Sequence, residues 1–196
     1  MILERISTLA VFVIAISTLL LLLSQNWRWS IVALALQYLA VFALILLVWP
    51  LGLAAVKLVA GWMAGAILGS SQPGPHLIEF APIRSSAFLF RFFVAMLVWV
   101  LVISLTPVVV GLLPLPSSLV TGAMLLIGMG LVQLGISTRP LRVLLGLLTT
   151  LAGFELIYGA VERSVMVAGL LAVVTLGMAF IGAYLFETLP GKEGAE

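Results

Sequence analysis

One carboxylate lies well inside an apolar run of the sequence. Glu155 belongs to the segment Ser137 to Ala160, which opens with a two-arginine turn and continues as a hydrophobic helix. It precedes Glu162 by seven residues, which places it roughly 7 Å from the middle of a helix over 140–161. Buried charges in spans usually face the bundle interior or an aqueous path. Glu155 is therefore either a proton- or cation-relay group or a protonated carboxyl that hydrogen-bonds a neighbouring helix for structure only.

Other polar residues extend this candidate site. Tyr158 and Glu162 follow Glu155 at helical spacing, which predicts a polar stripe along one face. Glu162 beside Arg163 is alternatively an ordinary interfacial turn. Lys57 is either an anchor that snorkels to the interface or a buried relay lysine paired with a carboxylate. Neutral polar side chains line a hydrated path or make interhelical hydrogen bonds; they are Gln37, Gln133 and Thr149.

Three glycines at four-residue spacing mark one helix face for close packing. Gly61, Gly65 and Gly69 remove the side chains from that face and let a neighbouring helix approach. The pattern does not say which helix that is.

Several classes of chemistry have no support in this sequence. The chain lacks cysteine and has one histidine, His76, so it offers no thiolate metal site or iron–sulfur cluster, and no metal or cofactor is expected. Serine–histidine pairs, paired metal-binding histidines and phosphate-cradling glycine loops are missing. The net charge of +2 is spread over short loops, which argues against nucleic acid as a partner.

The composition predicts an all-α integral membrane protein. Of the 196 residues, 64% are hydrophobic and 8% are charged, and the mean hydropathy is +1.35. Apolar runs of about twenty residues without two-residue alternation indicate transmembrane helices rather than a barrel. Seven spans are expected, over residues 3–23, 30–49, 51–69, 87–113, 117–136, 140–161 and 164–186.

Two three-helix units are expected, because the sequence matches itself weakly at a shift of 112 residues. That shift aligns 36–45 with 148–157 and places Ala43 opposite Glu155. Parallel repeats of this kind occur in membrane transport folds. The expected organisation is a first unit over 1–70, a loop over 71–86, a linking helix over 87–116, a second unit over 117–187 and a polar tail over 188–196.

The distribution of cations predicts the orientation in an inner, cytoplasmic membrane. The positive-inside rule assigns the cation-rich side to the cytoplasm, with the N-terminus outside and the C-terminus inside. The cations on that side are Arg28, Arg84, Arg91, Arg139, Arg142 and Lys192, against Arg5 and Arg163 on the other, which Lys57 joins if it snorkels to that interface.

The turn and helix STRPLRVLLGLLTTLAGFELIYG, followed by a glycine-dotted span, resembles the K subunit of complex I. It is more similar to hydrogenase-4 component E-like membrane subunits, and shares features with the C subunit of multi-subunit cation/proton antiporters. The resemblance covers about residues 118–187, with a fainter echo over 8–69. It implies a subunit, without redox centres of its own, of an ion-translocating oxidoreductase that contacts antiporter-like hydrophobic subunits and lipid.

The sequence departs from that family at both acidic positions. Gly146, Leu147 and Leu148 stand where the family has a Gly-Leu-Glu motif, and no acid lies between Ser164 and Phe186. These departures favour a non-catalytic supporting subunit or a partial relay completed by neighbouring chains. Two alternatives remain: a stand-alone small transporter or channel, and a structural scaffold that moves no ions.

Overall fold

The computed structural model describes residues 2–72, 85–162 and 164–188. Within these residues the chain forms seven helices and no strand, which confirms the predicted all-α fold class. The helices are α1 (Ile2–Leu23), α2 (Trp27–Ile45), α3 (Leu51–Ser70), α4 (Ser85–Leu112), α5 (Ser117–Ile136), α6 (Pro140–Val161) and α7 (Val165–Thr188).

All seven helices of the described part are long and apolar enough to cross a bilayer. The surface of the bundle is apolar as well, since large side chains such as Phe93, Leu97 and Phe180 are more than half exposed. Water would penalise such a surface, whereas lipid accepts it. The protein is a multi-pass helical membrane protein.

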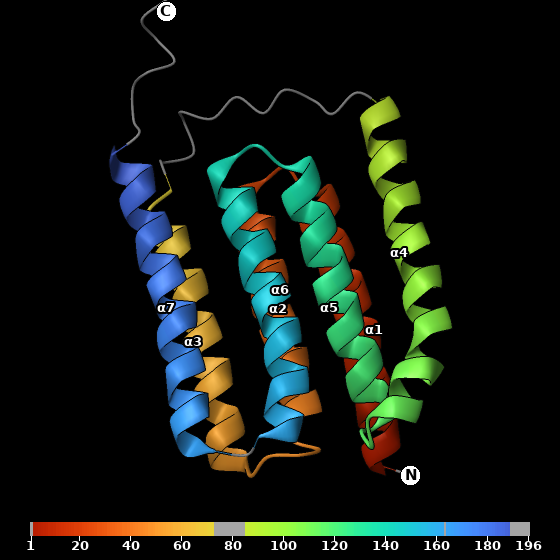
Figure 1. Ribbon diagram of the computed structural model, residues 1–196. Coiled ribbons are helices and arrows are strands. Elements are labelled where there is room, and N and C mark those ends of the chain that lie inside the picture. Colours follow the sequence, from red (N-terminus) through yellow and green to blue (C-terminus); the bar gives the residue numbers. More distant parts are fainter. Residues whose placement is uncertain (1, 73–84, 163, 189–196) are drawn as a thin grey trace, which may run out of the picture.

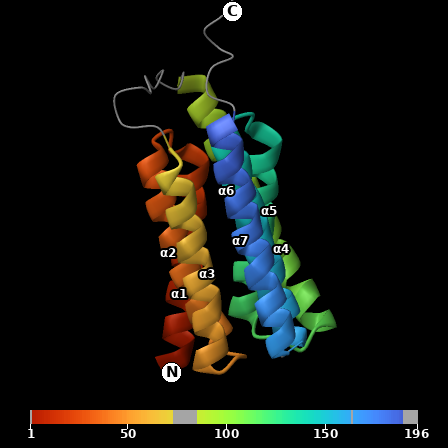
Figure 2. The ribbon, with the colours of Figure 1, turned by 90° about the vertical axis from the view of Figure 1, so that its left-hand side faces the viewer.

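Six of the helices form two layers that lie face to face (Figures 1 and 2). The layer of α1, α2 and α3 packs against the layer of α5, α6 and α7, and corresponding helices meet: α1 with α5, α2 with α6, and α3 with α7. Each corresponding pair runs in the same direction (Figure 1). The arrangement is that of two three-helix units of the same orientation, stacked so that each helix of one unit lies against its counterpart in the other.

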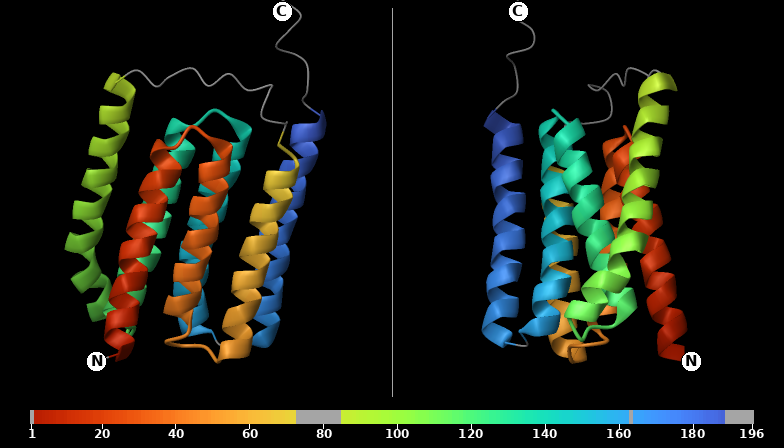
Figure 3. Two further views of the ribbon diagram at one scale, coloured as in Figure 1. Left: turned by 180° about the vertical axis from the view of Figure 1, so that it is seen from behind. Right: turned by 45° about the vertical axis from the view of Figure 1, so that its right-hand side comes forward.

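Helix α4 lies outside the two layers. It packs mainly against α5 and touches α1 (Figure 3). Because two three-helix units of the same orientation cannot follow each other directly, an additional span must return the chain across the bundle. Helix α4 has that place in the chain.

The predicted boundaries are correct for α5 and α6 and wrong for α2. Helix α2 begins at Trp27 rather than at residue 30, because the Asn26 side chain accepts a hydrogen bond from the Arg28 amide and caps the helix there. It ends at Ile45 rather than at Trp49. Residues 46–49 form turns ahead of Pro50, whose ring disfavours helical backbone before it.

The predicted glycine ridge packs on α2. A Cβ on Gly61 would come within 2.2 Å of the Tyr38 ring, whereas one on Gly65 would make only an ordinary contact of 3.7 Å with Leu34. Gly69 faces Ile31 and Trp27 at similarly ordinary distances. The ridge therefore brings α3 against α2 within the first unit, with its tightest point at Gly61.

A second set of glycines, not singled out from the sequence, joins α5 to α6. A Cβ on Gly153 would lie 2.7 Å from the Ala123 carbonyl oxygen, and one on Gly130 would lie 2.9 Å from the Gly146 carbonyl oxygen. Backbone meets backbone here, which holds α6 in one register against α5.

The bundle has two ends, called the Trp49 end and the Arg142 end after a residue near each. The Trp49 end holds the start of α1, the α2–α3 turn and the end of α6; the Arg142 end holds the end of α1 and the α5–α6 turn. Most of the expected loop 71–86 and tail 188–196 lies outside the described residues. So do His76, Arg84, Arg163 and Lys192.

Candidate functional site

A lysine and a glutamate form an ion pair inside the bundle. Lys57 Nζ, from α3, contacts Glu155 Oε2, from α6. Their side chains are only 6% and 2% exposed. Lys57 thus pairs with a carboxylate inside the bundle, and its ammonium does not reach the interface as a snorkelling anchor would.

Antiparallel packing brings the two charges to one depth. Lys57 lies six residues after the start of α3 and Glu155 six residues before the end of α6. At about 1.5 Å per residue, both lie roughly 9 Å from the helix ends at the Trp49 end. Because α3 belongs to one layer and α6 to the other, the pair joins the two units.

Thr175 of α7 binds both members of the pair. Lys57 Nζ donates to Thr175 Oγ1 at 3.4 Å, and that hydroxyl lies 3.3 Å from Glu155 Oε1 and 2.9 Å from the Leu171 carbonyl oxygen. A hydroxyl has one proton to donate, so Thr175 donates either to the carboxylate or to its own helix. It is a polar group that can change partners as the charge on Glu155 changes.

The ring of Tyr38, from α2, lies over the ammonium group of Lys57. Lys57 Nζ lies 5.3 Å from the centre of the Tyr38 ring, within the range of a cation–π contact. The Tyr38 hydroxyl is buried and has no hydrogen-bond partner among the described residues. Buried hydroxyls are normally satisfied, which makes this one notable so close to an ion pair.

A small cavity adjoins the pair on its Trp49 side. Its volume is about 10 Å³, close to the minimum for one water molecule. The residues that line it are Ile45, Trp49, Leu53, Val56, Lys57, Glu155, Ala168 and Leu171. Trp49 stands over the Gly159 backbone and donates its indole N–H to the Gly159 carbonyl, so an aromatic side chain closes the bundle beside the cavity.

Two buried ionisable groups in direct contact can exchange a proton. Burial disfavours both charges, and their mutual contact offsets that penalty only while both are present. A proton moving from Lys57 Nζ to Glu155 Oε2 neutralises both groups together. The arrangement can therefore store, release or pass a proton, or give up the Glu155 carboxylate to a competing cation.

A second polar contact lies between the middle helices. Gln37 Nε2 of α2 lies 3.3 Å from Thr149 Oγ1 of α6, and the Thr149 hydroxyl lies 3.4 Å from Gln37 Oε1. The two residues are 112 positions apart, so they occupy equivalent places in the predicted repeat. The contact therefore joins the central helices of the two stacked units.

Removal of either partner of the Gln37–Thr149 contact is expected to destabilise the protein by about 1 kcal/mol, since polar contacts between spans contribute about 0.6–1.7 kcal/mol. Gln37→Leu and Thr149→Val each leave one buried polar group unpaired. The double variant removes both and should be less destabilised than the sum of the two singles. An SDS unfolding titration of each variant measures this, and strictly additive losses would mean that the two residues do not interact.

The ion pair, in contrast, occurs once. In the alignment of the two units, Ala43 corresponds to Glu155 and Gly169 corresponds to Lys57. The two halves thus share a backbone arrangement but carry different chemistry, with the cation supplied by the first unit and the carboxylate by the second.

The predicted stripe of Glu155, Tyr158 and Glu162 does not form. Tyr158 is 40% exposed and stacks on Phe154 at 5.5 Å between ring centres. Three residues advance a helix by 300°, so Tyr158 lies about 60° away from Glu155, and here that angle takes it to the outer surface. Glu162 has extended backbone after the end of α6 and is exposed.

Gln133 is buried but belongs to neither polar contact. Its side-chain amide donates to the Arg142 carbonyl at 2.9 Å, near the start of α6. It fixes the α5–α6 turn, which matches the interhelical alternative considered for it.

Sequence reasoning missed Thr175 and Tyr38. Thr175 was signalled only as a hydroxyl in the middle of an apolar helix, and Tyr38 only as the neighbour of Gln37. Within the described part of the chain, no group of three or more His, Cys, Asp or Glu side chains gathers to hold a metal.

The fold and this site define the protein as a helical membrane protein with an ion pair between two three-helix units. In comparisons with known proteins, no family model, curated protein or solved structure matches the chain.

Proposed function

We propose that the protein is a proton- or cation-transfer component of a membrane assembly, and that Lys57 and Glu155 are its transfer site. The observation that carries this proposal is the direct Lys57–Glu155 contact, buried between two units of the bundle. Ionisable residues inside spans are rare and usually mark ion paths. A purely structural link between α3 and α6 needs no titratable groups.

The surrounding polar groups outline part of a route to and from the pair. From the Trp49 end, the cavity adjoins the pair, Thr175 binds both of its members, and Tyr38 covers Lys57. Gln37, next to Tyr38 on α2, begins the second polar contact. Beyond that contact, the route to the Arg142 end runs through apolar core residues such as Leu145 and Leu34, so a conformational change or a neighbouring subunit has to complete it.

The partners proposed are hydrophobic, antiporter-like membrane subunits of a complex I-like or energy-converting hydrogenase-like assembly. The sequence resemblance over 118–187 is the basis for this choice. The proposed membrane is the inner, cytoplasmic membrane, with the N-terminus outside. In the described part, the distribution of Arg28, Arg91, Arg139 and Arg142 at one end and Arg5 at the other supports this orientation.

A second candidate function is a stand-alone small transporter. The observation that favours it is the packing of two three-helix units of the same orientation on each other, since parallel repeats occur in transporters. Purification from native membranes in mild detergent separates the two. Co-migration with large hydrophobic subunits supports the first function, and a monomer or homo-oligomer that transports alone supports the second.

Replacement of both Lys57 and Glu155 by uncharged side chains tests the transfer site itself. In Lys57→Met/Glu155→Leu, ion transfer in membrane vesicles is expected to fall about 10²-fold, the lower end of what a positioned proton-transfer group contributes. The amount of folded, assembled protein should stay near wild type, because no unpaired charge is left. Gln133→Leu is the matched control, since it removes another buried polar contact that lies off the proposed route and carries no charge.

The structural scaffold is the outcome to exclude. If Lys57→Met/Glu155→Leu assembles normally and transfers ions at the wild-type rate, the pair serves structure only and the proposal is wrong.

A further inference from the structure

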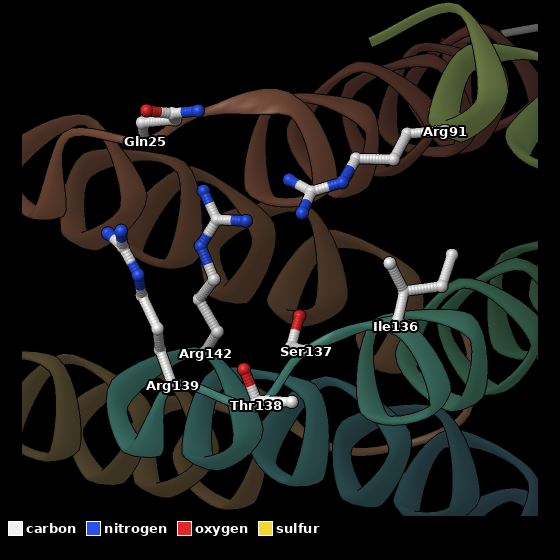
Figure 4. A pocket seen from close by; sticks show the side chains of 7 residues that line it. All are labelled: Gln25, Arg91, Ile136, Ser137, Thr138, Arg139 and Arg142. Atoms are coloured by element: carbon white, nitrogen blue, oxygen red, sulfur yellow. The ribbon is translucent and has the colours of Figure 1, made fainter. Parts of the chain in front are cut away.

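Three arginines converge on a pocket at the Arg142 end, remote from the ion pair (Figure 4). The pocket has a volume of about 110 Å³ and lies between the end of α1, the start of α4 and the α5–α6 turn. Its lining residues are Gln25, Arg91, Ile136, Ser137, Thr138, Arg139 and Arg142, with no acidic side chain among them.

Part of this cationic cluster stabilises the end of α1. Arg142 Nη2 donates to the Ser24 carbonyl, and Arg91 Nη1 lies 3.4 Å from the Leu22 carbonyl oxygen. The last carbonyls of a helix lack partners within the helix, and cations there are favourable. Each guanidinium has five N–H groups, so one such bond leaves most of the donors of Arg91 and Arg142 for other partners.

Arg139 does not cap α1, so capping does not explain why its side chain lies in this pocket. This residue is the N-cap of α6, is exposed, and makes neither of those bonds. Its guanidinium nevertheless reaches the same pocket, beside Arg142 and Gln25 (Figure 4). Three cations that share one pocket repel each other, and a bound anion would remove that repulsion.

The rest of the lining suits a phosphate group. The hydroxyls of Ser137 and Thr138 project from the α5–α6 turn on the same side as the Arg142 guanidinium (Figure 4). Helix α6 begins directly behind them at Pro140, and the free amides of a helix start favour anions. Guanidinium groups bind phosphate through paired hydrogen bonds.

The size and position limit the ligand. A volume of 110 Å³ is well below the roughly 300–1,000 Å³ of pockets that enclose whole small molecules, so one phosphate group fits while the rest of its molecule stays outside. The pocket lies where α6 begins and α1 ends, at the level expected for lipid headgroups.

We propose that Arg91, Arg139 and Arg142 form a binding site for the phosphate group of an anionic ligand. The two sources of that chemistry are an anionic phospholipid and soluble phosphate. The site is independent of the Lys57–Glu155 pair and does not depend on the function proposed for it.

Binding to the purified full-length protein in neutral mild detergent tests the site. Phosphatidylglycerol, phosphatidylcholine and inorganic phosphate are titrated separately, with native mass spectrometry for the lipids and thermal unfolding for all three. Stabilisation by phosphatidylglycerol alone assigns a lipid headgroup, and stabilisation by inorganic phosphate as well assigns soluble phosphate. In either case, Arg139→Gln should bind about tenfold more weakly, the effect of one lost charge-assisted hydrogen bond.

Arg28→Gln is the matched control. Arg28 lies at the same end and is exposed, but it rests over the Trp27 ring and does not line the pocket. Arg139 is chosen over Arg142 because its removal leaves the α1 contacts intact. The proposal is overturned if wild type binds neither phosphatidylglycerol nor phosphate more tightly than Arg139→Gln, or if Arg28→Gln loses as much affinity.

Discussion

Removal of one member of the ion pair is expected to destabilise the protein by about 3–5 kcal/mol, because it leaves the other charge buried and uncompensated. Glu155→Leu strands the Lys57 ammonium beneath the Tyr38 ring, and Lys57→Met strands the Glu155 carboxylate with only Thr175 to donate to it. Free energies of unfolding from SDS titration in mild detergent measure both losses.

The double variant is the control for that loss. Lys57→Met/Glu155→Leu replaces the pair by apolar side chains of similar size, an exchange that is often neutral or stabilising in protein interiors. Its stability is expected to return to within about 1 kcal/mol of wild type. If the double variant is as unstable as the sum of the two singles, the charges do not stabilise each other and the assigned contact is wrong.

Gly61→Ala is expected to destabilise the bundle by about 1–3 kcal/mol or more, as overpacking does. The added methyl would lie 2.2 Å from Cγ of Tyr38, an atom too near the backbone of α2 to move aside freely. Any displacement of that ring also disturbs the contact with Lys57, so the effect should reach the ion pair. Unfolding titrations and ion-transfer assays of the same variant measure the two consequences.

Gly65→Ala is the control for Gly61→Ala. It tests whether the loss of stability comes from the clash with the Tyr38 ring or from adding any methyl group to this helix face. It changes the next glycine of the same face, where the new methyl would make an ordinary 3.7 Å contact with Leu34. Its stability should stay near wild type or rise slightly, since Ala is the better helix former. Equal losses at both positions would show that the Tyr38 ring is not the cause.

The fold class and most helix boundaries were predictable, because apolar length alone decides them. Helices α5 and α6 begin and end where the turns around Pro116 and Pro140 predict. The α2 boundaries were not, since they depend on the Asn26 cap and on how Trp49 packs over Gly159. The Asn26 cap is a local contact with Arg28, whereas the Trp49 contact comes from a distant part of the chain.

The candidate site was predictable residue by residue but not as a set. Sequence reasoning gave Lys57 and Glu155 as separate candidates, because helical spacing relates residues on one helix and says nothing of the register between α3 and α6. The same limit explains the stripe with Tyr158, where a 60° offset was enough to move the ring to the surface. Thr175 enters the site only because α7 packs on α3.

The contact between Gln37 and Thr149 has a consequence for the history of such a chain. It pairs equivalent positions of two units that stack on each other in the same orientation. In a dimer of identical three-helix chains every substitution appears twice, so a lysine and a glutamate would each be duplicated. Because the two units lie in one chain, with α4 as the connection, their equivalent positions can differ: Lys57 of one unit pairs with Glu155 of the other, while Ala43 and Gly169 are uncharged. Fusion thus permits a single ion pair between two units whose helices are otherwise arranged alike.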